Sequence, residues 1–290
     1  MSLLKRIELP TVGLFIITLS ATTVVIAIFI FLLIDSYPVF TSIGLNFFTG
    51  REWHPADGVY GAFPMIYGSL TVTLLSVAFS LPLAIASAIL VSEFLSERWR
   101  IWVKGGMELL AGVPSIVYGL IGITILNALV KSTFVLNEGD SILTASILLG
   151  IMILPTIMTV SEDAIHRVPK EYRETAWGLG LTRTETITSV VLPIAASGIL
   201  GSILLGIGRA MGETMAVMLV IGSIDKLPAP FYNIFSPSQT MTSKLGREAA
   251  EALGSGLHWN ALVALGLTLF LIVVGITLVS NTFSKRWGKR

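Results

Sequence analysis

The sequence predicts an all-α membrane protein with six transmembrane helices. Only 13% of its 290 residues are charged and 53% are hydrophobic, with a mean hydropathy of +0.83, whereas soluble domains carry about 25% charged residues. Six apolar runs reach the roughly 20 residues that cross the hydrocarbon core of a bilayer. They lack the alternation of barrel strands, so each run must satisfy its own backbone hydrogen bonds as a helix.

The predicted spans belong to one transmembrane domain covering residues 1–290, and they run approximately over 12–34, 65–91, 107–130, 141–160, 199–221 and 261–279. The first run is too long for a signal-peptide core and no small-residue cleavage site follows it, so we expect it to be retained. Pro82, Pro114 and Pro155 fall inside spans two, three and four. Interior prolines are tolerated where neighbouring helices satisfy the freed carbonyls, which favours a packed bundle of kinked helices.

Two classes of site are disfavoured by residue content. The chain contains no cysteine, so disulfide and thiolate chemistry are excluded. Its three histidines, His54, His166 and His258, are scattered through loops without a carboxylate or second histidine at ligand spacing. A metal site is therefore not expected.

Basic residues gather on one side of the predicted membrane. The termini and the second and fourth loops contain Lys5, Arg6, Arg98, Arg100, Lys104, Arg167, Lys170, Arg173, Arg183, Lys285, Arg286, Lys289 and Arg290. The other three loops contain Arg51, Lys131, Lys226, Lys244 and Arg247, and Arg209 lies inside a span. Because positive charge accumulates on the cytoplasmic side, both termini and the loop 162–194 are predicted to be cytoplasmic.

The loop 162–194 has the signals of two short helices joined by a glycine. Pro169 suits the first turn of a helix that would end near Leu179, and Gly180 suits the left-handed conformation that terminates it. Thr182 and Glu185 match a capping box that begins a second helix, and Pro193 introduces the fifth span. The pattern predicts a compact, rigid elbow on the cytoplasmic face.

This elbow resembles the "EAA" loop of ABC importer permeases, which docks into a cleft on the ATPase subunit. The matching positions are Glu174, Ala176, Gly180, Val190, Leu192 and Pro193, with Thr175 in place of the first alanine. The resemblance implies an ABC importer permease fold with a cytoplasmic coupling hairpin, and a coupling role for Glu174, Ala176, Gly180, Leu192 and Pro193. The alternative interpretation is an interfacial amphipathic helix that only links two spans.

A pair of charged residues in the fifth span is the candidate substrate site. Arg209 lies ten residues past the predicted start of the span, hence roughly 15 Å deep, and Glu213 follows one turn later on the same face. Gly208 and Gly212 flank them and allow close approach of a helix or ligand. In one interpretation, Arg209 and Glu213 neutralise each other, or partners on neighbouring helices, and lock the bundle.

In the other interpretation, Arg209 offers its planar fork to an oxyanion. Phosphate near neutral pH keeps a hydroxyl proton that it can donate to a carboxylate such as Glu213, and sulfate does not. We therefore expect Arg209, Glu213, Gly208, Gly212 and Thr214 to line a path for a protonated tetrahedral oxyanion.

Three segments resemble phosphate ABC importer permeases of the PstC type: Gly208–Val217, Tyr60–Gly68 and Ala111–Gly119. The resemblance implies an inner-membrane subunit that pairs with a PstA-type permease, two PstB-type ATPases and an extracytoplasmic PstS-type phosphate-binding protein. The chain lacks a Walker-type loop, so ATP and Mg²⁺ are expected on the partner ATPase, and no cofactor or catalytic residue is expected here.

Three rival functions remain at this point. A permease for another oxyanion or a phosphonate has the same architecture. An ion-coupled secondary transporter or channel would act without an ATPase, which the coupling-loop resemblance opposes. A structural or sensory subunit would bind an ATPase and move nothing.

Overall fold

A computed structural model of the chain describes residues 9–287, with the side chains of residues 13–280 and 282. Of the basic residues used for orientation, Lys5, Arg6, Lys289 and Arg290 lie outside the described residues, as do the side chains of Lys285 and Arg286. Nearly all the described chain is helical, apart from one two-stranded hairpin and the connecting loops.

Six segments within the described residues are long and apolar enough to cross a membrane, which confirms the predicted number. They cover Gly13–Ser42, Phe63–Phe94, Ser115–Phe134, Ile142–His166, Arg183–Gly212 and Leu257–Ser280. Their main helices are α1 (Leu9–Ser42), α3 (Phe63–Ile89), α5 (Ser115–Ile121) with α6 (Asn127–Phe134), α7 (Ile142–His166), α10 (Leu192–Gly212) and α13 (Leu257–Trp287).

The predicted bounds of the third span are wrong because the chain breaks within them. Helix α4 (Glu97–Ala111) ends before Pro114, whose ψ of 135° is extended, and α5 starts at Ser115. Proline lacks an N–H and disfavours a helical conformation in the residue before it, so the apolar run 107–130 could not be one helix. The apolar run 107–130 thus contains the last turn of α4 and the separate helix α5.

The predicted bounds of the fifth span are wrong at both ends. The helical segment already begins at Arg183 and stops at Gly212, and a separate short helix, α11 (Met215–Val220), follows. Threonines and a serine in the first turns concealed the early start from a hydropathy argument. A π-helical segment, Ile187–Val191, precedes Pro193, which has no N–H to donate.

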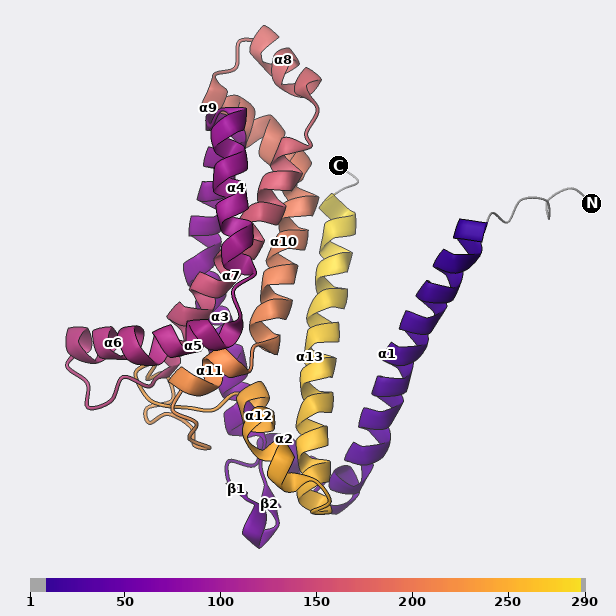
Figure 1. The fold of residues 1–290 in the computed structure, drawn as a ribbon, viewed down its shortest axis with the longest axis vertical. Helices are drawn as coiled ribbons and strands as arrows, with labels where there is room; N and C mark the ends of the chain where they lie inside the picture. The colour runs from indigo at the N-terminus through magenta and orange to yellow at the C-terminus, as the bar shows by residue number, and fades with distance from the viewer. Residues whose placement is uncertain (1–8, 288–290) are drawn as a thin grey trace, which may run out of the picture.

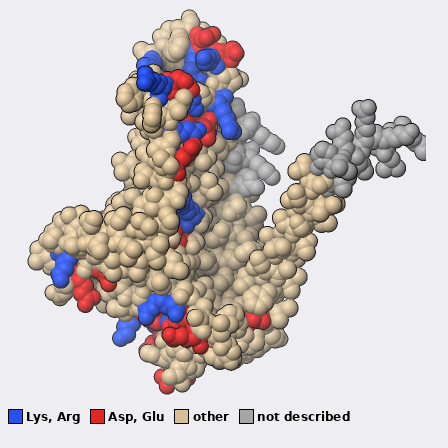
Figure 2. All heavy atoms as spheres, in the orientation of Figure 1, with Lys and Arg blue, Asp and Glu red and all other residues tan. Residues whose placement is uncertain are grey.

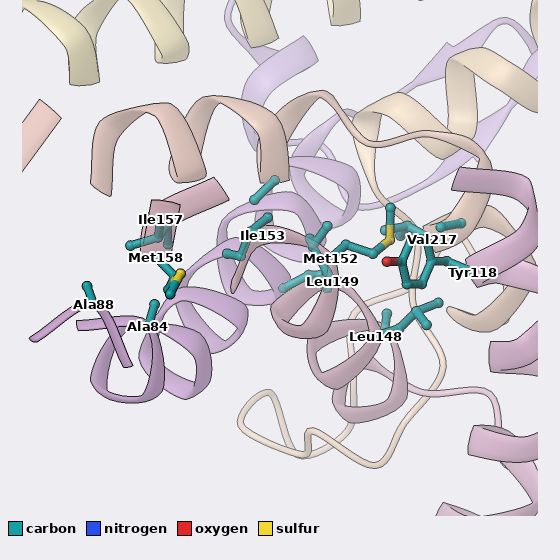
Figure 3. Close-up of a cluster of buried hydrophobic side chains, with 14 of the residues drawn as sticks. Ala84, Ala88, Tyr118, Leu148, Leu149, Met152, Ile153, Ile157, Met158 and Val217 are labelled. Carbon is teal, nitrogen blue, oxygen red and sulfur yellow. The ribbon is translucent and has the colours of Figure 1, made fainter. Parts of the chain in front are cut away.

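Helix α7 is the centre of the bundle. Of its most apolar stretch 72% is buried, compared with 0% for α1. Figure 3 shows Met158 of α7 beside Ala84 of α3, whose small side chain lets the two helices approach, and Leu148 near Tyr118 of α5. Gly206 of α10 is equally close, since a Cβ there would lie 2.6 Å from Ile157 of α7. Thus α7 fixes the positions of α3 and α10.

The molecule has two differently built ends (Figure 1). At one end lie α8 (Lys170–Gly178) and α9 (Arg183–Thr186). At the other lie α2 (Asn46–Thr49), the antiparallel hairpin β1 (Trp53–His54) and β2 (Val59–Tyr60), and α12 (Met241–Ala252). Charged side chains gather at these two ends, and most of the surface between them is uncharged (Figure 2).

Helix α1 stands apart from the bundle. It meets α13 near the hairpin end and then diverges from it (Figure 1). Asp35 joins the two helices, because its carboxylate accepts from Trp259 Nε1 at 3.1 Å and its carbonyl from Asn260 Nδ2 at 2.6 Å. Phe29 stacks on Phe270 at 5.4 Å between ring centroids.

Candidate functional site

The elbow between spans four and five forms as its sequence predicts. Pro169 precedes α8, and Gly180 takes the left-handed conformation, with φ of +87°. Thr182 and Glu185 make the reciprocal hydrogen bonds of a capping box at the start of α9. The geometry of the elbow is therefore confirmed, and its contact with an ATPase stays a prediction.

The outer surface of the elbow is apolar as well as charged. Ala176 is buried and anchors α8 to the body, whereas Glu174 is exposed. Tyr172, Trp177 and Leu179 are 52%, 53% and 76% exposed. Large side chains left exposed on a polar helix mark an interaction surface. Sequence reasoning gave these three residues no role, although aromatic residues in so polar a segment were a usable signal.

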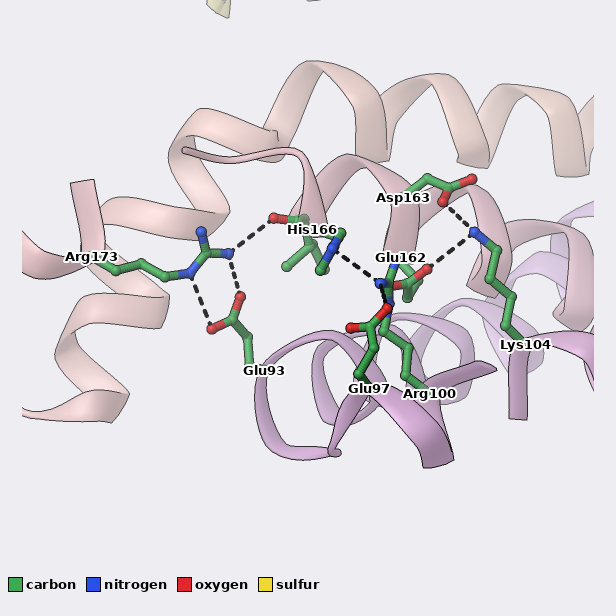
Figure 4. A network of polar contacts seen from close by, with 9 residues as sticks. Glu93, Glu97, Arg100, Lys104, Glu162, Asp163, His166 and Arg173 are labelled. Atoms are coloured by element: carbon green, nitrogen blue, oxygen red, sulfur yellow. Dashed lines mark hydrogen bonds and ion pairs between the residues drawn. The ribbon is translucent and has the colours of Figure 1, made fainter. Parts of the chain in front are cut away.

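Glu93 holds both arms of the elbow. It lies in a π-helical segment, Leu90–Phe94, that extends α3, and it pairs with Arg173 of α8 at 2.6 Å. Arg173 also donates to the carbonyls of Ile165, at 3.1 Å, and Val168 (Figure 4). Arg183 of α9 donates to the Glu93 carbonyl and lies 4.3 Å from the centre of the Phe94 ring. These contacts tie α8 and α9 directly to the end of α3.

A buried glutamate ties α4 to the same end of the bundle. Glu162 of α7 is fully buried, and its carboxylate accepts from Arg100 Nε at 2.6 Å and lies 3.4 Å from Lys104 Nζ (Figure 4). Lys104 also pairs with Asp163, and Arg100 contacts His166 at 3.0 Å. These basic residues entered the sequence argument only as markers of orientation, because nothing in their spacing shows which carboxylates they meet.

The second candidate site lies where α10 ends. Arg209 sits three residues before the end of this helix, and Glu213 follows it with an extended ψ of 125°. Counted from Leu192, Arg209 is about 26 Å along the helix at 1.5 Å per residue. The helix starts earlier than its hydropathy indicated, and the depth of Arg209 in the membrane stays a prediction.

Arg209 and Glu213 do not pair, which overturns the interpretation of a mutual salt bridge. The Arg209 guanidinium donates to Thr156 Oγ1 of α7 at 2.7 Å and to the carbonyl of Ala111 at 3.1 Å. One Glu213 carboxylate oxygen accepts from the Ala216 N–H at 3.2 Å, at the start of α11. Because the helix breaks at Glu213, the two residues are not one turn apart on a common face.

The flanking residues have distinct environments. A Cβ on Gly208 or Gly212 would meet no atom within 4 Å, so this chain itself does not use the close approach that they permit. Thr214 packs closely against Gly246 of α12, since a Cβ added to this glycine would lie 2.7 Å from the Thr214 methyl group. A role of these residues in a substrate path stays a prediction.

Comparisons with known proteins identify the family that has both the elbow and the region at the end of α10 within its matched residues. A family model described as "Binding-protein-dependent transport system inner membrane component" matches residues 80–289. The chain belongs to this family. As one of these inner-membrane components, it is a multi-pass subunit of an ABC importer.

Curated relatives of this permease carry a more specific name. The "Phosphate transport system permease protein PstC" of Pasteurella multocida is 36% identical, over 93% of this chain and 91% of the relative. The "Probable phosphate transport system permease protein PstC" of Methanocaldococcus jannaschii is 32% identical, over 94% and 93%. The resemblance to PstC-type permeases is thereby confirmed.

Solved structures share the fold at low identity. A bacterial alginate ABC transporter, solved with an alginate-bound periplasmic protein, aligns with a TM-score of 0.60 and 20% identity over 97% of this chain and 93% of that one. The MetNI methionine ABC transporter aligns with a TM-score of 0.58 and 12% identity over 78% and 94%. These likenesses confirm the ABC importer permease fold.

The permease has a further polar cluster at its hairpin end, which sequence reasoning missed. Lys244 of α12 is almost completely buried, pairs with Asp225 and Glu248, and lies 5.1 Å from the centre of the Trp53 ring. His258, expected to lack a carboxylate partner, contacts Glu248 at 3.0 Å. No group of three or more potential metal ligands occurs among the residues that the structure describes.

The pKa of Glu248 is lowered by its partners in this cluster. Burial alone would raise it, but the hydrogen bonds and charges of Lys244 and His258 outweigh burial and lower it. The pKa of Tyr60, which stacks against His258, is raised by burial and by the charge of Glu248. The cluster fastens the hairpin, α12 and the start of α13 into one cap.

Proposed function

We propose that this permease carries inorganic phosphate inward, driven by ATP hydrolysis on separate subunits. The observation that supports this most directly is the close relation, over nearly the whole chain, to permeases whose names state phosphate transport. An Arg209 guanidinium with hydrogen-bonding capacity left, close in sequence to a half-buried Glu213, suits a protonated oxyanion.

The subunit is non-catalytic in this proposal. ATP and Mg²⁺ bind to two PstB-type ATPases, whose closure pushes the elbow around Gly180. Tyr172, Trp177 and Leu179 supply the apolar contact, and the Glu93–Arg173 pair passes the movement to α3. A PstA-type permease completes the membrane path, and a PstS-type binding protein delivers phosphate at the hairpin end.

The orientation follows from the elbow. Both termini and α8 face the cytoplasm, where the ATPases are, and the hairpin and α12 face outward. The positive-inside rule supports the same orientation independently.

Phosphate uptake by reconstituted vesicles tests the proposal. The permease is coexpressed with a PstA-type permease and PstB-type ATPases, and uptake is followed with ATP and a loaded PstS-type protein. We expect uptake that requires ATP, resists an uncoupler and is not inhibited by excess sulfate, molybdate or phosphonate. Uptake lost to an uncoupler would favour a secondary transporter, and uptake of a different anion in preference would identify another oxyanion importer.

A further inference from the structure

A small polar cavity lies beside the break between α10 and α11. Its polar lining comes from Ser69 and Thr73 of α3, from Glu213, and from Thr240 and Thr242 at the start of α12. These four hydroxyl-bearing residues are 4–6% exposed, so all are buried. Of these five residues, only Glu213 was predicted from the sequence to belong to a site, because the other four are remote from it along the chain.

Part of the hydrogen-bonding capacity around the cavity is not used within this chain. Ser69 Oγ accepts from the Met241 N–H at 2.9 Å, and Thr242 donates to the Glu213 carbonyl at 2.8 Å. Within residues 13–280, however, the hydroxyl protons of Ser69 and Thr73 have no protein acceptor. The second carboxylate oxygen of Glu213 likewise has no protein donor there, since only Oε1 receives the Ala216 N–H.

Two hydroxyl donors and one carboxylate that line the same cavity define the chemistry of an occupant. It must accept hydrogen bonds from hydroxyl groups and donate one to a carboxylate. A tetrahedral oxyanion that still carries a proton does both. Sulfate has no proton to donate to the Glu213 carboxylate, so it cannot make this contact.

The cavity is closed to such an occupant in this conformation. It leaves about 10 Å³ for water-sized spheres, which is room for about one water molecule. The first turn of α12 closes it against α3, and the approach is tight: a Cβ on Gly68 would lie 2.1 Å from the Gln239 carbonyl oxygen. Withdrawal of the start of α12 from α3 would enlarge the cavity.

We propose that this cavity is the closed form of a binding site for protonated phosphate, in which Ser69 and Thr73 donate hydrogen bonds and Glu213 accepts one. The site rests on the proposed phosphate transport and extends it, since it assigns substrate contacts to α3 and a gating position to the start of α12. Val72, Leu149 and Val217 form apolar walls around the hydroxyl groups, which strengthens hydrogen bonds to an occupant.

Removal of one hydroxyl group tests the site. In the assembled transporter, Thr73→Val keeps the shape of the side chain and removes the donor, and maximal phosphate uptake should fall roughly tenfold, the effect of one hydrogen bond to a charged group. Ser69→Ala should act in the same direction, and Thr73→Ser, which keeps the hydroxyl, should retain at least half of the uptake.

Ser76 supplies the matched control. It is a buried serine on the same helix whose hydroxyl donates to the Thr73 carbonyl within α3, at 2.9 Å, and it does not line the cavity. Ser76→Ala should transport like the original chain. Equal uptake by Thr73→Val, Ser69→Ala and Ser76→Ala would overturn the site.

Substrate protection gives a readout that a merely structural role would not change. Because the chain has no cysteine, Thr73→Cys places a single thiol in the cavity. We expect a small methanethiosulfonate reagent to modify it during ATP turnover, severalfold more slowly with phosphate and at the same rate with sulfate. A cysteine at the exposed Ser132 on α6 should react at one rate in all conditions. Labelling of Thr73→Cys that ignores phosphate would contradict the proposal.

The two proposals fail differently in these experiments. If the unmodified complex takes up no phosphate, the transported substrate is something else. If it takes up phosphate but the Thr73 and Ser69 variants match Ser76→Ala and show no protection, phosphate takes another route and only the cavity assignment fails.

Discussion

Arg209 connects three parts of the bundle through one guanidinium group. It projects from α10, donates to Thr156 of α7 and donates to the last carbonyl of α4, at Ala111. Its remaining N–H groups have no protein acceptor within residues 13–280, since a guanidinium carries five donors and two are used. The two protein contacts hold the fork in a fixed orientation, so the planar shape of the group matters as well as its charge.

Arg209→Lys separates shape from charge. An ammonium group keeps the charge but cannot reach Thr156 and Ala111 with one planar fork, so we expect phosphate uptake to fall at least tenfold. Uptake normalised to assembled transporter is the measurement. Arg247→Lys is the control, since Arg247 is an exposed arginine of α12. Normal uptake by Arg209→Lys would mean that charge alone is sufficient.

The residue-scale prediction from sequence was half right, for a physical reason. A charged residue in an apolar run has to find partners, so Arg209 could be singled out from sequence alone. Its partners could not, because Thr156 and Ala111 come from helices 53 and 98 residues away. The expected partner, Glu213, does not contact Arg209, because the helix ends at Gly212. Hydropathy does not register such a break inside an apolar run.

Glu248 makes the hairpin end sensitive to acid. Its pKa in the folded protein lies below its ordinary value of 4.5, so its pairing stabilises the fold fully above pH 4.5 and the stabilisation is lost as the pH falls below this value. We expect the thermal midpoint of the detergent-solubilised permease to stay level above pH 4.5 and to fall as the pH is lowered below this value. Glu248→Gln should lower the midpoint at pH 7, because Lys244 keeps only Asp225, and should weaken its pH dependence.

Glu251 provides the comparison for this measurement. It is exposed on the same helix and makes no ion pair among the described residues. Glu251→Gln should leave both the midpoint and its pH dependence unchanged. An unchanged acid response in Glu248→Gln would assign the effect to other carboxylates.

At the scale of elements, the elbow depends on the conformation of one glycine. Gly180 has φ of +87° with open space around it, so a side chain there meets backbone strain rather than a clash. Gly180→Val should insert into the membrane normally yet fail to stimulate ATP hydrolysis. Gly178→Ala is the matched control: it adds a methyl group two residues away, within α8, also in open space. If both variants stimulate ATP hydrolysis equally, the elbow only links two spans and does not couple them to the ATPase.

The exposed surface of α8 makes a second prediction about this element. Trp177 is 53% exposed beside the buried Ala176, so Trp177→Ala should leave the permease folded. We expect it to weaken retention of the ATPase roughly tenfold, as for a truncated aromatic anchor. Pull-down from mild detergent measures this retention. Glu174→Lys should weaken retention as well, because it reverses a charge at the docking surface, and full retention by both variants would move the contact elsewhere.

The sequence predicted the elbow better than the spans around it. Gly180, Thr182 and Glu185 act through neighbours in the chain, so their pattern is local and can be recognised. The break in span five depends on tertiary partners, such as the contact of Thr242 with the Glu213 carbonyl. The break in span three comes from Pro114, which was expected to lie inside a continuous kinked span. Apolar composition continues through both breaks, which is why the predicted bounds crossed them.

The whole molecule has a predicted orientation that single cysteines can test. In this cysteine-free chain, a thiol at Asp57 in the hairpin or at Ser236 should react with an impermeant reagent outside intact cells. A thiol at Thr182 in the elbow should react only after the membrane is opened. External labelling at Thr182 would invert the orientation and place the elbow away from any ATPase.

The contact between α1 and α13 can form only after α13 has been synthesised. The hydrogen bond from Trp259 to Asp35 joins residues 224 positions apart, and translation at about 5–20 residues per second needs roughly 10–45 s to cover that interval. During this time α1 resides in lipid without its partner within this chain. Its uncharged surface from Gly13 to Ile34 tolerates this delay, but Asp35 waits unpaired near one end. A chain that stops before Trp259 therefore leaves the Asp35 carboxylate without this hydrogen-bond donor.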